Sequence, residues 1–324
     1  MDIKKIQGLF RTDASIEGWN QQAPYTLEQS KSRYADWQNH AKAHDLQPME
    51  HLLPRIYCPC PAELPAFMLQ ADNIKPDDQL IQQRDELGPW GFWFKLAPDI
   101  TTKNLDIIGC NRITCRSHLI TSTVEKLLGK HLPEATVLDI ACHSGFFSLD
   151  MASRGVKHVT GMELRDININ QAKFLQKYFD IKNISFEQGD ITTWKPQQQF
   201  SVVLNLGLLY HVIDPITLVR QTYDWCRDFA VIDTICHPEP VSAFIAAFNK
   251  DASSHSEGKH SVELHPTYRA LIDTMHDAGF VDLVELIADE GDGGRVSHYY
   301  RNRLRRCIIG FKRPMADVLA DNGI

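Results

Sequence analysis

From residue 135 onward, short apolar runs alternate with stretches of helical periodicity. Runs such as "ATVLDIAC" (135–142) and "FSVVLNLG" (200–207) are continuously apolar, which predicts strands buried on both faces. Between them, apolar residues recur every three to four positions, as in "RDININQAKFLQKYF" (165–179), which predicts helices. The expected strands are 135–142, 158–164, 183–190, 200–207, 229–235, 281–287 and 306–312, and the expected helices are 145–155, 165–179, 214–226 and 266–280. This alternation predicts a mostly parallel α/β sheet covered on both faces.

The last two expected strands break the rhythm. "VDLVELI" (281–287) and "RCIIGFK" (306–312) are separated by a loop and not by a clear helix. Parallel strands need a crossover connection, usually a helix. We therefore expect these two strands to pair antiparallel at one edge of the sheet.

Residues 1–115 lack this alternation. They hold a polar helical stretch (26–44), a proline-rich segment (52–65) and the aromatic segment "LGPWGFWFKLAPDITT" (87–102). The pattern predicts a mainly helical N-terminal extension with an aromatic loop, followed by the main domain, 116–324. The aromatic run is interpreted as core packing, or alternatively as a wall of the substrate pocket in which Trp93 contacts the substrate.

Composition narrows the class of protein. Hydrophobic residues make up 43% of the chain and charged residues 23%, as in folded globular proteins. No apolar run reaches the roughly 18 residues of a membrane span, and "MDIKKIQGLF" resembles no signal peptide. The eight scattered cysteines favour reduced thiols over a disulfide framework, so we expect a cytoplasmic protein. The net charge of −7 disfavours a duplex binder, although "YYRNRLRR" (299–306) is a candidate basic patch.

The candidate chemistry lies where the strands end. In open parallel sheets, ligands bind outside the carboxyl ends of the strands. The first strand carries Asp139 and leads into the turn "ACHSG", in which Gly145 permits close packing of the next helix. Neither G-x-G-x-x-G nor the lysine-containing phosphate loop is present. The turn is therefore not expected to hold a phosphate.

Acidic residues also end the next two strands. Glu163 follows Asp139 by 24 residues, the distance at which an acid accepts hydrogen bonds from both hydroxyls of a ribose. Asp190 ends the third strand, where it is placed to accept from an adenine amino group. Acids at three successive strand ends indicate a nucleoside-binding site.

Four stretches carry a family resemblance: "VLDIACHSGFFSLDMA", "VTGMEL", "FEQGDI" and "FSVVLNLGLLYHVIDP". Over residues 115–313 the chain resembles class I S-adenosylmethionine-dependent methyltransferases. The resemblance implies a Rossmann-like seven-stranded sheet with a reversed last strand, and S-adenosylmethionine as cofactor. It also implies these contacts: Asp139, Ala141, His143 and Gly145 with the methionine half, Glu163 with the ribose, Leu164, Asp190 and Ile191 with the adenine, and Asn205 and Gly207 near the methyl group.

The turn departs from the family pattern D-x-G-x-G-x-G. Ala141 and His143 replace the first two glycines. We expect Ala141 to be tolerated because its φ stays negative. His143 either donates to the cofactor carboxylate or merely covers it. The departure also keeps open a non-enzymatic protein that binds the cofactor as a sensor or scaffold.

A narrower resemblance concerns "LGLLYHVIDP", which is similar to the tRNA wobble-uridine methoxy- and carboxymethoxy-forming transferases. A carboxylated cofactor would need a fixed cation, best an arginine. The sequence shows no clear candidate, which favours ordinary methyl donation. Within the same stretch, His211 is the candidate general base with Tyr210 beside it. The alternative interpretation is that His211 only orders the loop backbone. Asp214 either orients His211 or makes an ordinary turn before Pro215.

A long insertion, about 236–266, follows the fifth strand and is interpreted as a cap over the substrate site. Its four histidines match no zinc spacing, so no metal is expected. Residues expected to reach the substrate are Trp93, Tyr268, Arg295, Tyr299 and Tyr300. The favoured function is methyl transfer to O, N or S of a small-molecule metabolite. The alternative is a tRNA wobble-uridine methyltransferase or carboxymethyltransferase, with a basic surface from Arg301, Arg303, Arg305 and Arg306.

Overall fold

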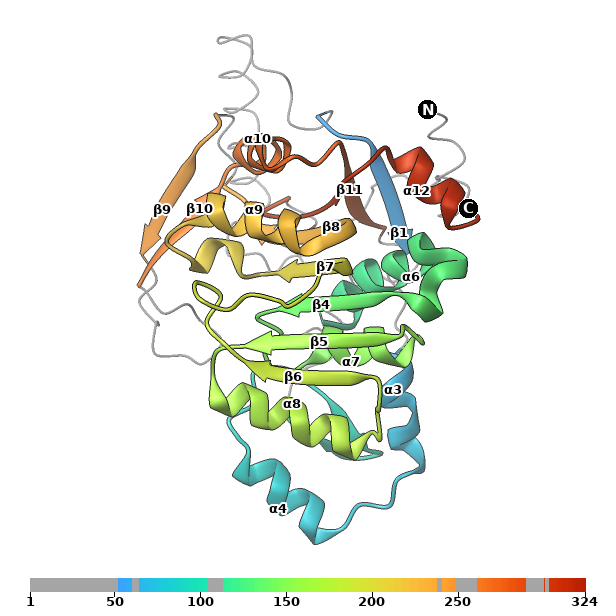
Figure 1. Cartoon of the computed structure of the whole chain (residues 1–324). Coiled ribbons are helices and arrows are strands. Elements are labelled where there is room, and N and C mark those ends of the chain that lie inside the picture. Colours follow the sequence, from blue (N-terminus) through green and yellow to red (C-terminus); the bar gives the residue numbers. More distant parts are fainter. Residues whose placement is uncertain are drawn as a thin grey trace.

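The computed structural model describes residues 52–59, 64–103, 113–237, 241–248, 261–289, 300 and 303–324. At its centre lies an eight-stranded sheet (Figure 1). From one edge to the other, the strands are β6 (Ile184–Gln188), β5 (His158–Glu163), β4 (Thr136–Ile140), β7 (Phe200–Leu206), β8 (Cys226–Ile235), β12 (Arg305–Phe311), β11 (Asp282–Asp289) and β1 (Arg55–Pro59). Strand β12 is antiparallel to both of its neighbours, and all other pairs are parallel.

The predicted mostly parallel sheet with a reversed last strand is confirmed. The antiparallel pairing of β11 with β12 is also confirmed. The structure adds an eighth strand, β1, which comes from the proline-rich segment for which we predict no strand. It pairs with β11 from Arg55 opposite Glu285, so β11 does not form the edge of the sheet. Covering β11 protects backbone groups that an edge strand would leave unpaired.

Two layers of helices bury the two faces of the sheet. Along β4, Val137 belongs to one apolar core and its neighbour Leu138 to the other, because successive side chains point to opposite faces. The Val137 face is covered by α3 (Ala66–Leu69), α6 (Thr123–Leu128), α7 (Phe146–Ser153), α8 (Asp166–Tyr178) and α12 (Met315–Asp321). The Leu138 face is covered by α9 (Pro215–Trp225) and α10 (Tyr268–Ala278).

Local sequence signals explain where several helices begin and end. Asp214 caps α9 by accepting a hydrogen bond from the Thr217 N–H at 2.9 Å, and Pro215 occupies the first turn. Thr267 caps α10 in the same way, through the Ala270 N–H at 3.1 Å. Gly279 ends α10 at a φ of +111°, which glycine adopts without strain.

The register aligns the carboxyl ends of the central strands. Ile140 of β4 lies opposite Met162 of β5 and Asn205 of β7, and Leu206 lies opposite Asp233 of β8. We call this side of the sheet, the carboxyl ends of β4 to β8, the carboxyl edge. In Figure 1 the arrowheads of β4, β5 and β6 point toward it. Residues that follow different strands therefore meet there.

Smaller elements surround this core. The N-terminal region adds η2 (Gln70–Asn73), α4 (Asp78–Glu86) and a hairpin of β2 (Lys95–Ala97) and β3 (Ile100–Thr101). The π-helical turn η3 (His118–Ser122) and the 3₁₀ turn η4 (Gly129–Glu134) precede β4, and the 3₁₀ turn η5 (Leu209–His211) follows β7. In the described part of the insertion, β9 (Phe244–Phe248) and β10 (Val262–Pro266) form an antiparallel hairpin, the cap hairpin.

Candidate functional site

The turn after β4 adopts a glycine-like backbone at positions that are not glycine. The φ angles are +54° at Ala141, +54° at His143 and +80° at Gly145. A residue with a Cβ pays about 1–2 kcal/mol for this left-handed conformation. The expectation of a negative φ at Ala141 is therefore wrong. The turn keeps the backbone of a glycine-rich loop and accepts local strain at two positions, as functional turns often do.

Glu163, at the end of β5, fastens this turn. Its Oε2 accepts a hydrogen bond from the His143 N–H at 3.0 Å, and its Oε1 accepts from the Arg165 N–H at 2.9 Å. The residue is only 4% exposed. Each carboxylate oxygen has a second lone pair, so the group can still accept from ligand hydroxyls. Glu163 thus joins the turn after β4 to the turn after β5.

Asp139 braces the same turn from the side of α7. Its Oδ2 accepts a hydrogen bond from the Ser148 hydroxyl at 2.5 Å, and the residue is almost fully buried. Burial raises the pKa of the Asp139 carboxyl to about 7, although the Ser148 hydrogen bond and Arg116 oppose the rise. The side chain therefore holds strand and helix together beneath the turn.

His143 is packed under the N-terminal aromatic segment. Its ring stacks on Phe92 with centroids 4.6 Å apart, and its Nδ1 accepts the Ser144 N–H at 2.7 Å. A Cβ on Gly91 would lie 2.5 Å from the imidazole, so only glycine fits at that position. This arrangement favours a covering role for His143 over one that reaches out to a ligand.

The rest of the aromatic segment is core. Trp90, Trp93 and Phe94 are at most 9% exposed, which confirms core packing for these side chains and places Trp93 away from any open surface. Gln171 of α8 pins the segment by donating to the carbonyls of Leu87 and Pro89 at 2.8 and 2.9 Å. The N-terminal region therefore forms a fixed wall beside the turn.

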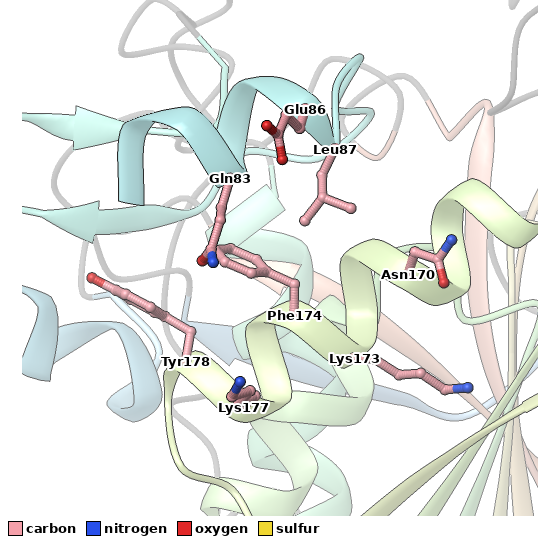
Figure 2. A pocket seen from close by; sticks show the side chains of 8 residues that line it. All are labelled: Gln83, Glu86, Leu87, Asn170, Lys173, Phe174, Lys177 and Tyr178. Carbon is pink, nitrogen blue, oxygen red and sulfur yellow. The ribbon is translucent and has the colours of Figure 1, made fainter. Parts of the chain in front are cut away.

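A pocket of about 560 Å³ lies between α4 and α8 (Figure 2). Phe174 and Tyr178 of α8 face Gln83 and Leu87 across it. None of the turns that directly follow β4, β5, β6 and β7 contributes a residue to the lining of this pocket. It is a seam where the N-terminal region docks on α8, separate from the candidate site at the carboxyl edge.

The turn after β6 carries the third acid. Asp190 Oδ1 accepts from the Thr192 N–H at 3.0 Å and from the Thr192 hydroxyl at 2.8 Å. Leu164 and Ile191, which follow β5 and β6, are half-buried. Asn205 of β7 is fully buried and donates through Nδ2 to the Thr222 hydroxyl of α9 at 3.1 Å, so its side chain faces α9.

Two arginines converge beside Gly207, at the end of β7. The buried Asp233 of β8 accepts from Arg305 Nε at 2.6 Å, from Arg116 Nε at 3.0 Å and from the Tyr300 hydroxyl. Burial alone would raise the pKa of Asp233, but the two guanidinium groups and Tyr300 lower it below its usual value. A Cβ on Gly207 would lie 2.8 Å from Arg305 Nη2 and 3.4 Å from Arg116 Nη2. Two cations and one anion therefore meet at the carboxyl edge.

These arginines correct two predictions. We predict no cation near the methyl-transfer position, yet Arg116 and Arg305 lie beside Gly207. Arg305 and Arg306 are also predicted to form a basic surface, which is wrong. Arg305 is bound to Asp233, and Arg306 is 2% exposed and donates to Glu285 at 2.6 Å. Pairing with a distant buried carboxylate leaves no local sequence signal.

Tyr268 is predicted to reach the substrate, but it lies in the core. It is 1% exposed, and its hydroxyl donates to Glu285 at 3.0 Å while Arg306 stacks on its ring at 4.1 Å. Burial raises the pKa of this phenol well above its usual value. Tyr300 contacts Asp233 as described, whereas Arg295, Tyr299 and Arg301 lie outside the described residues.

The cap hairpin reaches the candidate base. His211 Nδ1 lies 3.1 Å from Oε1 of Glu263, and His265 Nε2 lies 2.8 Å from Oε2 of the same carboxylate. The Tyr210 ring packs on His211 at 4.1 Å. Burial lowers the pKa of His211 to about 4, against the opposing effect of Glu263. Of the two roles considered for Asp214, orienting His211 or making a turn before Pro215, the structure shows the second, because its side chain caps α9. No sequence spacing signals Glu263.

Within the described residues, no three His, Cys, Asp or Glu side chains are arranged to hold a metal ion. Among the helices of this same part of the chain, none is long and apolar enough to cross a membrane.

Comparisons with known proteins agree with this geometry. Residues 114–284 match the family described as a methyltransferase domain. The tRNA U34 carboxymethyltransferase of Desulfotalea psychrophila is 26% identical over 166 residues, which cover 50% of this chain and 51% of that protein. Phosphoethanolamine N-methyltransferase 1 of Arabidopsis thaliana is 28% identical over 167 residues, 50% of this chain and 31% of that protein. The chain thus spans about half or less of the length of these curated relatives.

A solved structure shares the fold. The crystal structure of the N-terminal domain of EvdMO1, in the presence of SAH and D-fucose, superposes with a TM-score of 0.55 at 19% identity. The match covers 74% of this chain and 98% of that domain. At this identity the likeness shows the fold alone.

Proposed function

Because this chain belongs to the family of methyltransferase domains, we propose that it transfers a methyl group from S-adenosylmethionine to O, N or S of a small-molecule acceptor. The observation that carries the proposal is the joint placement of a strained turn, two acids and a buried histidine at one edge of the sheet. A nucleoside cofactor and an acceptor would meet there.

The residues at the carboxyl edge fit the cofactor. The turn 141–145 presents backbone with left-handed geometry at three positions, as a close approach to a ligand requires. Glu163 retains lone pairs for the ribose hydroxyls, and Asp190 follows β6 where the adenine amino group would lie. Leu164 and Ile191 would contact the adenine. When bound, the cofactor supplies an electrophilic methyl group on a sulfonium.

His211 is the proposed general base for an acceptor that must lose a proton. Its low pKa keeps the imidazole neutral at pH 7, so that it can accept a proton. The His211 and Glu263 side chains are each 10% exposed, so the acceptor end is screened from water. An enclosed acceptor end, the burial of Arg306 and the pairing of Arg305 with Asp233 support a small acceptor over a nucleic acid.

Calorimetric titration with S-adenosylmethionine and S-adenosylhomocysteine tests the cofactor site. The Glu163→Ala, Asp190→Ala double variant removes two charged acceptors, each worth about 1.5–3 kcal/mol. We expect a loss of affinity of more than 100-fold, whereas Glu134→Ala, at an exposed position in η4, leaves binding unchanged. No binding to the wild type would overturn the proposal. Labelled methyl transfer to purified tRNA, with none to a pool of cell metabolites, would overturn the choice of acceptor.

The second candidate is carboxymethyl transfer to a tRNA wobble uridine. Arg116 and Arg305 beside Gly207 favour it. Both pair with Asp233, so the two arginines and this one carboxylate together carry one excess positive charge. A carboxylated cofactor would place its extra anion on this pair. The candidate predicts at least tenfold tighter binding of carboxy-S-adenosylmethionine than of S-adenosylmethionine, a preference lost in Arg116→Met. Equal affinity for both cofactors would exclude it.

A further inference from the structure

The cap hairpin directs two ionisable side chains at His211. Glu263 and His265 lie two residues apart on β10, so both point to the same face of the strand. That face meets η5, where Glu263 is 8% exposed, whereas Val262 on the opposite face is 51% exposed. In Figure 1 the hairpin stands at the carboxyl edge, the side toward which β4 to β6 point.

Glu263 bridges the two histidines with its two oxygens. Oε2 lies 2.8 Å from His265 Nε2, and Oε1 lies 3.1 Å from His211 Nδ1. The His211–Glu263 contact is within ion-pair distance, but its geometry is not aligned for a hydrogen bond. Contacts of this kind often align only when a substrate is bound. The Tyr210 ring lies against both imidazoles, at 4.1 Å from His211 and 5.5 Å from His265.

We propose that Glu263 is the positioning residue of His211 and that His265 holds Glu263 in place, so that the cap hairpin completes the base. This inference rests on the proposed function. The acceptor X–H attacks the methyl carbon as the carbon–sulfur bond breaks, and the sulfur keeps the bonding electron pair. The proton of X–H moves to Nε2 of His211. His211 then carries a positive charge, which the nearby Glu263 carboxylate balances. The Nδ1–H of His211 donates a hydrogen bond to that carboxylate.

The charges around His211 predict in which direction each substitution should shift the pKa of His211. Burial lowers the pKa of His211 most, Glu263 raises it, and His265, Arg305 and Arg165 lower it. Among the described residues, Tyr210 is a further titratable group in contact with His211. Replacing Glu263 by an uncharged residue therefore lowers the pKa further, and replacing His265 raises it. If Glu263 were only a latch for the hairpin, either variant would rehydrate His211 and raise its pKa.

The experiment is NMR of ¹⁵N-histidine-labelled protein, free and saturated with S-adenosylhomocysteine, for wild type, Glu263→Gln and His265→Gln. At pH 7 we expect the Nδ1–H tautomer of His211 to dominate in the wild type and to decline in Glu263→Gln. The pKa of His211 should fall by about one pH unit in Glu263→Gln and rise in His265→Gln. Glu134→Gln, an exposed carboxylate on η4, is the matched control and leaves both readouts unchanged.

A rise of the pKa in both variants, or an unchanged tautomer in Glu263→Gln, would overturn the proposal. Should Glu263→Gln fail to fold, Glu263→Asp serves instead, because it withdraws the carboxylate from His211 and keeps the charge. It should reduce the Nδ1–H tautomer, and an unchanged tautomer would again overturn the proposal. Failure of S-adenosylhomocysteine to bind the wild type would instead count against the proposed function, while the histidine signals of the free protein still decide the role of Glu263.

Discussion

The part of the candidate site proposed to hold the cofactor, the cofactor half, is built from residues close together in the chain. The part proposed to hold the acceptor, the acceptor half, is built from residues far apart. We define the cofactor half as residues 139–145 with Glu163 and Asp190. The acceptor half consists of Gly207, Tyr210 and His211 with their partners Arg116, Asp233, Glu263, His265, Tyr300 and Arg305. In the first, each acid lies at or near the carboxyl end of its own strand. In the second, the Asp233 carboxylate gathers groups from two distant segments, Arg116 on one side and Tyr300 with Arg305 on the other.

The two halves also differ physically: the cofactor half contains strained backbone, whereas the acceptor half encloses charged side chains. The cofactor half has backbone strain at Ala141 and His143, and its three acids accept hydrogen bonds from nearby N–H and hydroxyl groups. The acceptor half keeps ordinary backbone at most positions but buries a net positive charge around Asp233. Backbone strain is a local property, while burial of charge depends on the whole fold. The two halves should therefore respond to different substitutions.

The largest effect is expected at Asp233. Asp233→Asn leaves Arg116 and Arg305, whose side chains are only 14% and 12% exposed, without their buried counter-charge, which should lower the free energy of unfolding by roughly 3–5 kcal/mol. Asp228→Asn is the matched control on the same strand, because Asp228 pairs with the 61% exposed Arg227. It should cost less than about 1 kcal/mol. Urea unfolding measures the free energy of unfolding of both variants. Equal losses of stability would show that the Asp233 carboxylate does not balance the two arginines.

The next-largest effect is the pH dependence of the free energy of unfolding that Asp139 contributes. The folded-state pKa of Asp139 is raised from 3.8 to about 7 by burial, so between these values the folded state holds a proton that the unfolded state has lost. Stability from this group is therefore full below pH 4 and falls, by at most about 1.4 kcal/mol per pH unit, up to pH 7. Asp139→Asn should remove this slope. Urea midpoints of both proteins from pH 4 to 8 check it, and parallel profiles would contradict the burial argument.

A smaller loss of stability is expected when the contact between Gly91 and His143, where the N-terminal region covers the turn after β4, is overpacked. Gly91→Ala places a Cβ 2.5 Å from the His143 ring and should destabilise the protein by about 1–3 kcal/mol through overpacking. In a His143→Ala background the same change should cost little, because the ring is gone. Thermal or urea unfolding of the four proteins of this double-mutant cycle gives the coupling. Additive effects would mean that Gly91 does not rest on His143.

The smallest effect has the opposite sign. Ala141→Gly relieves a left-handed alanine and should stabilise the protein by about 0.5–1 kcal/mol, after the entropy cost of glycine. Ala152→Gly, in the helical backbone of α7, should destabilise it by about 1 kcal/mol or more. The melting temperatures should move in opposite directions. A loss of stability in Ala141→Gly would show that the turn is unstrained there.

The amino-acid sequence was enough to predict the layers of the sheet, the reversed last strand and the three acids at or near the carboxyl ends of β4, β5 and β6. These follow from periodicity and from which residue ends each strand, both of which are local properties. Only the tertiary structure decided that a proline-rich segment adds β1, that Arg116 meets Asp233, and that Glu263 rather than Asp214 faces His211. A buried ion pair forms because both partners leave water together, and their distance along the chain plays no part in that energy. The positive φ at Ala141 is likewise a feature of the folded turn, since alanine by itself disfavours this conformation.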